Sequence, residues 1–193
     1  MNSENTRVSL NARKLTYIAI LTAIVFLLQF ISLFMRFSAF SLTFVLVPIV
    51  IGVALCDWKV GTWLGLVFGV AVLVSGDAAM FLAWDPFGTV VTVLLKGMLA
   101  GLLAGVSYKL FERVNQYCAV LVAAVVAPVV NTSVFVGGSM LFFYDDISAL
   151  AGGAEVFPYI LTAFVGVNFF VELGVNLILS PTVTRIINIR KKS

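Results

Sequence analysis

The residues best suited to chemistry in this chain are Lys96 and Glu172, two charged side chains deep inside hydrophobic segments. The sequence as a whole is 62% apolar and has a mean hydropathy of +1.13. An ionisable group at bilayer depth is costly unless it faces a polar cavity or a partner, so such a group marks a functional site by default. The two residues therefore predict a cavity that binds a ligand.

Two alternatives to a ligand site remain for these charges. Lys96 lies about seven residues past Thr89, which is roughly 10 Å below the predicted outer end of its helix. A lysine that faces lipid at that depth could extend its ammonium group to the interface. A buried ion pair between Lys96 and Glu172 could instead lock two helices together. We favour a position facing the bundle because Gly97 follows Lys96 directly and begins a stripe of glycines.

Three further amides extend the candidate site. Asn168, Glu172 and Asn176 are spaced by four and therefore share one face of the last predicted helix. Asn168 is the nearer of the amides to the outer side, whereas Asn176 is better suited to packing or to contact with a partner. Asn131 follows Pro128, which frees a backbone carbonyl. Its side chain either satisfies that carbonyl or reaches into the cavity.

Composition places the chain among integral membrane proteins. Charged residues make up 11% of its 193 residues, far below the roughly 25% typical of soluble domains. A helix needs about 20 apolar residues to span the hydrocarbon layer, and the sequence has space for about six such runs. We therefore predict an all-α fold with six transmembrane helices in one compact bundle.

The residues that the chain lacks exclude most enzymes. It contains no histidine, the commonest metal ligand and general base. An enzyme would need a nucleophile with its base, or a metal cluster, and neither pattern is present. We predict no catalysis, no metal and no cofactor. Cys56 and Cys118 lie near predicted cytoplasmic helix ends, where thiols stay reduced, so we expect no disulfide.

Hydropathy divides the chain into a cytoplasmic stub at 1–14, a membrane domain at 15–187 and a basic tail at 188–193. The second predicted span is short and contains Pro48, so we expect it to be kinked. Polar and aromatic loops at 76–88 and 144–157 join the later spans, and Trp84 in the first loop is the best candidate for a lid. The predicted spans are 15–35, 42–55, 60–75, 89–110, 119–143 and 158–187.

Basic residues set the predicted orientation. With both termini in the cytoplasm, all lysines and arginines except Arg36 and Lys96 fall on the inner side, as expected for a bacterial plasma-membrane protein. The net charge of +3 reflects this topology and suits anionic lipid, so it gives no reason to expect nucleic acid. The outer loops are acidic and contain Asp77, Asp85, Asp145, Asp146 and Glu155.

Small residues recur at every fourth position in three helices. Two such stripes are Gly61, Gly65 and Gly69 in the third span and Gly97, Gly101 and Gly105 in the fourth. Glycine at this spacing lets helix backbones approach closely, and we interpret both stripes as internal packing. A shorter pair, Ala19 and Ala23, lies about one turn inside the predicted cytoplasmic surface.

The order of these features along nearly the whole chain resembles the substrate-binding S components of energy-coupling factor (ECF) transporters, in particular the branch with pantothenate-specific and many unassigned members. The matching segments are the basic stub, Ala19 and Ala23, Leu46-Val47-Pro48-Ile49-Val50-Ile51-Gly52, the stripe from Gly61 to Gly69, the run from Lys96 to Gly105, Asn131-Thr132, and Asn168, Glu172 and Asn176.

The resemblance implies a membrane subunit that captures a vitamin outside the cell. It would dock on one transmembrane scaffold protein and two ATPases and topple in the membrane to release its substrate. The alanine pair of the family contacts the scaffold, which corresponds to Ala19 and Ala23 here. Leu95-Lys96 stands where the family pattern has Pro-Arg, so the charge is kept and its geometry is not.

We therefore expect a substrate site built from Lys96, Asn131, Asn168 and Glu172 and lidded by Trp84. Lys96 would counter a carboxylate, and the other polar groups would bind hydroxyl or amide groups. Pantothenate fits this inventory best, although riboflavin and other vitamins would also be served. The chain has no Gly-x-x-x-x-Gly-Lys-Ser/Thr sequence, so ATP must be hydrolysed by partner subunits. The alternative is a self-sufficient secondary transporter or channel, for which inverted repeats are not visible.

Overall fold

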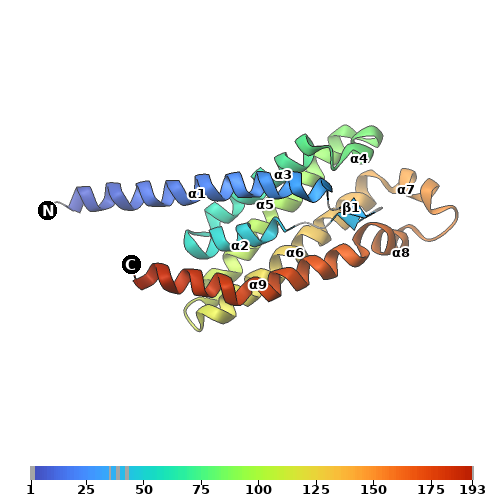
Figure 1. Cartoon of the computed structure of the whole chain (residues 1–193). Helices are drawn as coiled ribbons and strands as arrows, with labels where there is room; N and C mark the ends of the chain where they lie inside the picture. Colours follow the sequence, from blue (N-terminus) through green and yellow to red (C-terminus); the bar gives the residue numbers. More distant parts are fainter. Residues whose placement is uncertain (1–2, 35, 38–39, 42–43, 193) are drawn as a thin grey trace.

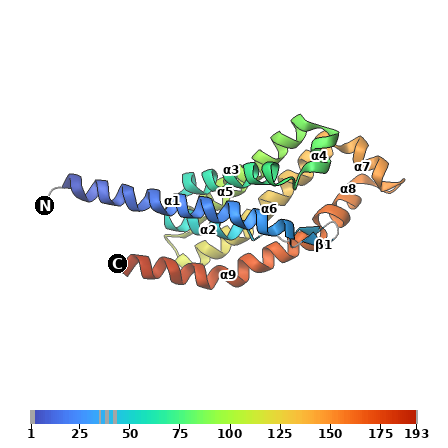
Figure 2. The same cartoon turned by 45° about the horizontal axis from the view of Figure 1, so that its top comes forward.

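The computed structural model describes residues 3–34, 36–37, 40–41 and 44–192. Its long helices run side by side along the length of an elongated bundle (Figure 1). The start of α1 and the end of α9 lie at the same end of this bundle, and the short helices α4, α7 and α8 lie at the other end, as a second view also shows (Figure 2). We call these the terminal end and the loop end.

Helices make up nearly all of the described chain. The five long helices are α1 (Ser3–Phe34), α3 (Trp58–Ser75), α5 (Pro86–Phe111), α6 (Gln116–Phe142) and α9 (Gly166–Lys192). The shorter ones are α2 (Leu46–Leu55), α4 (Ala79–Trp84), α7 (Tyr144–Ala151), α8 (Val156–Tyr159) and the π-helix η1 (Ile160–Val165). Between α1 and α2, the two-residue strands β1 (Arg36–Phe37) and β2 (Phe40–Ser41) pair antiparallel.

Five segments of the described chain are long and apolar enough to cross a membrane: Ala12–Phe34, Trp58–Ser75, Pro86–Phe111, Gln116–Phe142 and Val156–Ile189. This confirms the all-α membrane class, whereas one of the six predicted spans is not among the candidate spans of the described residues. The second predicted span, 42–55, contains a helix of only ten residues, Leu46–Leu55. Such a helix is about 15 Å long, half of the roughly 30 Å of hydrocarbon.

Capping residues fix where the long helices begin and end. The Asp57 side chain accepts a hydrogen bond from the amide of Val60 and so caps the start of α3. Asn115 caps α6 in the same way, and Pro86 occupies the first turn of α5. Gly76 ends α3 with a left-handed φ of 78°, a conformation that favours glycine. The segment 76–88, which was predicted to be a loop, is largely helical, because it contains α4 and the first residues of α5.

The two glycine stripes face each other, which confirms their interpretation as internal packing. A Cβ atom added to Gly65 would overlap the carbonyl oxygen of Gly97, and one added to Gly97 would overlap that of Gly65. Gly61 and Gly101 stand in the same relation one turn away. The backbones of α3 and α5 therefore touch directly, which brings the two helices closer than any side chain would allow.

The apolar interior forms two clusters. The larger one joins α1, α2, α3, α5, α6 and α9 and includes Leu64 and Phe68. The smaller one lies at the loop end around Phe143, Ile147 and Ile160, and Phe81 packs against it. Polar side chains separate the two clusters, and they form the candidate site.

Candidate functional site

A cavity of about 180 Å³ lies between the two apolar clusters. Its walls come from α3, α5, α6, η1 and α9, and from the turn and short helix that follow α3. Six of its lining residues are polar or charged and five are phenylalanines, and this mixture is typical of sites for small organic ligands. The polar set is Asp77, Lys96, Asn131, Thr132, Asn168 and Glu172, and the aromatic set is Phe68, Phe81, Phe135, Phe164 and Phe169.

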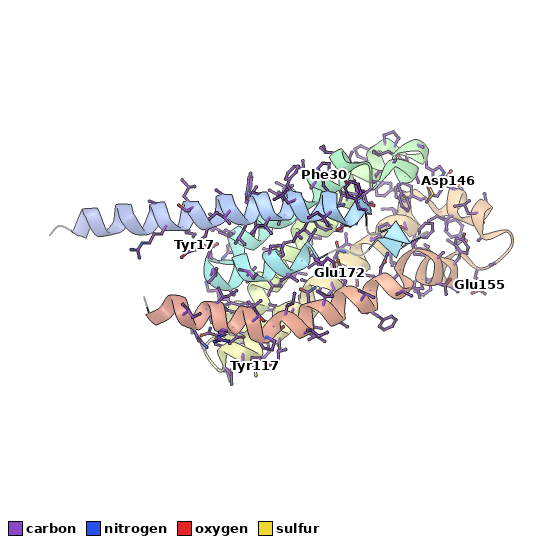
Figure 3. All side chains as sticks on the ribbon, viewed as in Figure 1. Tyr17, Phe30, Tyr117, Asp146, Glu155 and Glu172 are labelled. Carbon is purple, nitrogen blue, oxygen red and sulfur yellow. The ribbon has the colours of Figure 1, made fainter. Side chains whose placement is uncertain are left out.

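Four of the five residues predicted to bind substrate line this cavity. Lys96 comes from α5, Asn131 from α6, and Asn168 and Glu172 from α9. Figure 3 shows Glu172 in the interior of the bundle, between α9 and the helices that face it. Three helices that are separate in the sequence therefore bring their deeply placed polar groups to one place.

Lys96 lies among aromatic rings. Its Nζ atom is 5.7 Å from the centre of the Phe68 ring and 5.4 Å from that of Phe135. Rings at this distance attract a cation, and the attraction is stronger where water is excluded. Glu172 lines the same cavity. Because Lys96 lines an internal cavity, the arrangement in which it faces lipid does not hold in this structure.

Two amides contribute acceptors that the described residues leave without hydrogen-bond partners. Asn131 is only 8% exposed, and its Oδ1 atom is buried without a partner among those residues. The Oδ1 atom of Asn168 is in the same state. Buried polar atoms are nearly always hydrogen-bonded in proteins. These two amides are therefore available to a molecule with donor groups once it enters the cavity.

Asn176, one turn further along α9, has a structural role. Its Nδ2 atom donates a hydrogen bond of 2.8 Å to the backbone oxygen of Glu172, and the Ser180 hydroxyl donates one of 2.7 Å to the backbone oxygen of Asn176. Asn176 is buried and does not line the cavity. This agrees with the packing role that its depth favoured.

Trp84, the fifth predicted residue, does not line the cavity. Its ring meets that of Phe81 edge to face, with 5.3 Å between ring centres, and lies 6.3 Å from that of Phe143. Phe81 itself lines the cavity. Trp84 therefore lies outside the cavity at the loop end, where it packs against Phe81, a residue of the cavity lining.

The family model described as the substrate-specific component of ECF transporters matches residues 13–184. This chain is an ECF S component. It is therefore a non-catalytic transport subunit, a multi-pass protein of the cell membrane that pairs with the ECF module. No curated protein and no solved structure gave a significant match.

The two residues predicted to dock the S component on its scaffold, Ala19 and Ala23, are exposed on α1. On the other side of the same helix, Leu21 and Val25 are buried against the bundle. The alanine pair is thus accessible, and its small side chains leave the backbone of α1 uncovered at these two positions.

An ion pair at the terminal end of the bundle holds α1 of the S component to the start of α3. Lys14 Nζ lies 2.5 Å from Oδ2 of Asp57, the residue that caps α3. Burial works to raise the pKa of the Asp57 carboxyl, but the hydrogen bonds from Lys14 and from the Val60 amide outweigh it and hold this pKa below its usual value. One carboxylate therefore joins the start of α3 to α1.

Sequence reasoning missed Asp77 and the five phenylalanines of the S component's cavity. Asp77 was assigned to an acidic outer loop, although its place directly after a helix-ending glycine could have indicated a fixed position. The phenylalanines gave no signal, because the chain has 17 of them and apolar residues dominate every span. Phe164 and Val165 lie in η1, whose wider turns re-aim side chains, and such turns are frequent at functional sites.

Proposed function

We propose that this S component captures a small water-soluble vitamin that carries a carboxylate together with hydroxyl or amide groups, and that pantothenate is the best candidate. Transport into the cell would be driven by two ATPases through a transmembrane scaffold protein. The observation that carries the proposal is the convergence of Lys96, Asn131, Asn168 and Glu172 on one cavity.

The chemistry of the cavity supports this choice. The Lys96 ammonium group suits a carboxylate, and the two amides suit the amide and hydroxyl groups of pantothenate. The phenylalanine rings suit its branched aliphatic part. The volume of about 180 Å³ is below the roughly 300–1,000 Å³ of sites for drug-sized ligands. Size therefore favours a compact vitamin over a large one such as riboflavin.

Charge supports an orientation with the loop end outside. Basic residues at the ends of membrane spans face the cytoplasm. Arg13 and Lys14 lie in the first turn of the span Ala12–Phe34, and Arg185 lies in the last turns of the span Val156–Ile189, all toward the terminal end. Asp146 and Glu155 lie at the loop end (Figure 3). The turn that contains Asp77 and the helix that contains Phe81 wall the cavity on the loop side. A ligand would then enter from outside the cell.

Native mass spectrometry of the purified protein tests the proposal, because a bound vitamin would add its own mass to the chain. Isothermal titration with pantothenate, and with riboflavin, thiamine and biotin as comparisons, then measures selectivity. Binding of pantothenate at least about tenfold tighter than the other three supports the proposal. Binding of another vitamin in its place overturns the pantothenate assignment, and copurification without ATPases would favour a self-sufficient transporter.

A further inference from the structure

We propose that Asp77 is a ligand-contacting residue of this cavity and that Gln29, a residue of α1 outside the cavity, is the side chain that positions it. The inference rests on the proposed function only in taking the cavity as the vitamin site. It adds a binding residue that the sequence patterns did not indicate, and it assigns a role to a polar residue in the middle of an apolar helix.

Asp77 occupies a fixed place in the cavity wall. It lies in the turn between α3 and α4, next to Gly76 with its φ of 78°. It lines the same cavity as Lys96 and Glu172. The turn therefore brings a second carboxylate to a site that already has one.

Gln29 reaches Asp77 from behind. Its Nε2 atom donates a hydrogen bond of 3.1 Å to Oδ2 of Asp77 and a longer one of 3.4 Å to the Ser75 hydroxyl. That hydroxyl donates in turn to the backbone oxygen of Val72 at 3.1 Å. Gln29 has an exposed fraction of 0% and does not line the cavity. Its contact with a ligand must therefore pass through Asp77.

The cost of burying Gln29 argues that its hydrogen bond has a purpose. A buried amide loses its hydration, and only partners that replace water offset this loss. In Gln29 the Nε2 atom has such partners, whereas the Oε1 atom is buried without one among the described residues. A hydrogen bond to a charged acceptor is stronger than one between neutral groups. With one carboxylate oxygen held by Gln29, the Asp77 side chain keeps a single orientation, so its acceptor atoms are set before a ligand arrives.

The chemistry of a carboxylate names the ligand group that Asp77 would bind. Asp77 lines the same cavity as Lys96. Carboxylates accept hydrogen bonds and cannot donate them when ionised. If Lys96 binds the ligand carboxylate, Asp77 matches a donor on the same molecule, which is a hydroxyl, an amide N–H or an ammonium group.

The test compares Asp77→Asn, Gln29→Leu and the double variant with the wild-type protein, by isothermal titration with pantothenate. Each single variant should weaken binding by about tenfold or more, which is the range expected for a hydrogen bond to a charged group. Because Gln29 acts through Asp77, Gln29→Leu should cause little further loss once Asp77→Asn is present. If Gln29 had a merely structural role, Gln29→Leu would weaken binding by the same factor in the wild-type protein and in Asp77→Asn.

Thr22→Val is the matched control, because Thr22 accepts another hydrogen bond between α1 and α3, from Trp63 Nε1 at 3.2 Å, and does not line the cavity. This control should bind pantothenate as the wild type does. Unchanged binding in both single variants overturns the inference and leaves the proposed function intact. If the wild type binds riboflavin, thiamine or biotin but not pantothenate, the proposed assignment fails and the same comparison with that vitamin decides the inference. Binding of none of the four overturns both.

Discussion

At the scale of single residues, the cavity shows how an apolar bundle accommodates charge. Lys96 lies close to two phenylalanine rings, in a cavity that Glu172 also lines. The rings replace part of the hydration of the ammonium group, and the same cavity contains the carboxyl group of Glu172. Neither contact saturates an ammonium group that has three donors. The proposed ligand carboxylate would therefore find N–H donors on Lys96 that the aromatic contacts leave available.

Replacing Lys96 with alanine should weaken pantothenate binding at least about tenfold, because removal of a desolvated counter-charge costs several kcal/mol. Isothermal titration measures the effect. Lys59→Ala is the control, since Lys59 lies over the ring of Trp58 and does not line the cavity. Wild-type affinity in Lys96→Ala would exclude Lys96 from the site. Loss of folded protein in this variant alone would favour a structural ion pair with Glu172.

The ion pair between Lys14 and Asp57 predicts a pH dependence of stability. The folded pKa of Asp57 lies below its unfolded value, so the pair contributes its full stabilisation above the unfolded value of about 4 and loses it as the pH falls through the folded value. The side chains are 40% and 33% exposed, which limits the contribution to about 1 kcal/mol or less. Thermal unfolding of Asp57→Asn should show a lower midpoint than wild type at pH 7. An equal difference at pH 3 would contradict this assignment.

At the scale of elements, some features could be predicted from sequence and others could not. The glycine stripes recur with the helical period, so their packing role could be deduced from their spacing alone. The length of α2 was overestimated, because hydropathy measures how apolar a segment is and not where its helix begins. Four polar residues of the cavity could be predicted, because polar residues are rare within these apolar helices. Asp77 and the phenylalanines could not, because only the three-dimensional arrangement separates them from other loop acids and other apolar residues.

The direct contact between α3 and α5 predicts a sharp difference between two glycines. Gly97→Ala adds a Cβ atom that would overlap the backbone of Gly65, so the helices must separate at a cost of about 1–3 kcal/mol. Gly137→Ala in α6 adds the same atom where nothing lies within 4 Å. This control should match or exceed wild-type stability, because alanine favours helix by up to about 1 kcal/mol.

The midpoint of thermal aggregation in detergent, followed by size-exclusion chromatography, compares the two variants with the wild type. Gly97→Ala should lower the midpoint and Gly137→Ala should not. Equal midpoints for all three proteins would mean that α3 and α5 pack less closely than the structure indicates.

At the scale of the whole molecule, the candidate substrate cavity and the predicted docking pair lie on different parts of the bundle. The cavity is built from α3 to α9, whereas Ala19 and Ala23 are exposed on α1. None of the residues of the transmembrane part of α1 lines the cavity among those described. If the cavity binds substrate and the alanine pair docks the scaffold, as we propose, this separation makes the two functions separable by mutation.

Replacing both Ala19 and Ala23 with tryptophan should abolish ATP-driven uptake and leave ligand binding unchanged. The added rings would hold a partner helix away from the α1 backbone, and they would lie on the face of α1 opposite the bundle contacts of Leu21 and Val25. Two measurements are needed: pantothenate binding by the isolated protein, and uptake by vesicles that contain the scaffold and both ATPases.

Ile31→Trp is the control, because Ile31 is also exposed on α1 but lies about 12 residues, or roughly 18 Å, beyond Ala19. Uptake by the control with none by the double variant locates docking at the alanine pair. Persistent uptake in the double variant would place the docking surface elsewhere, and loss of binding would mean that the pair packs inside the protein.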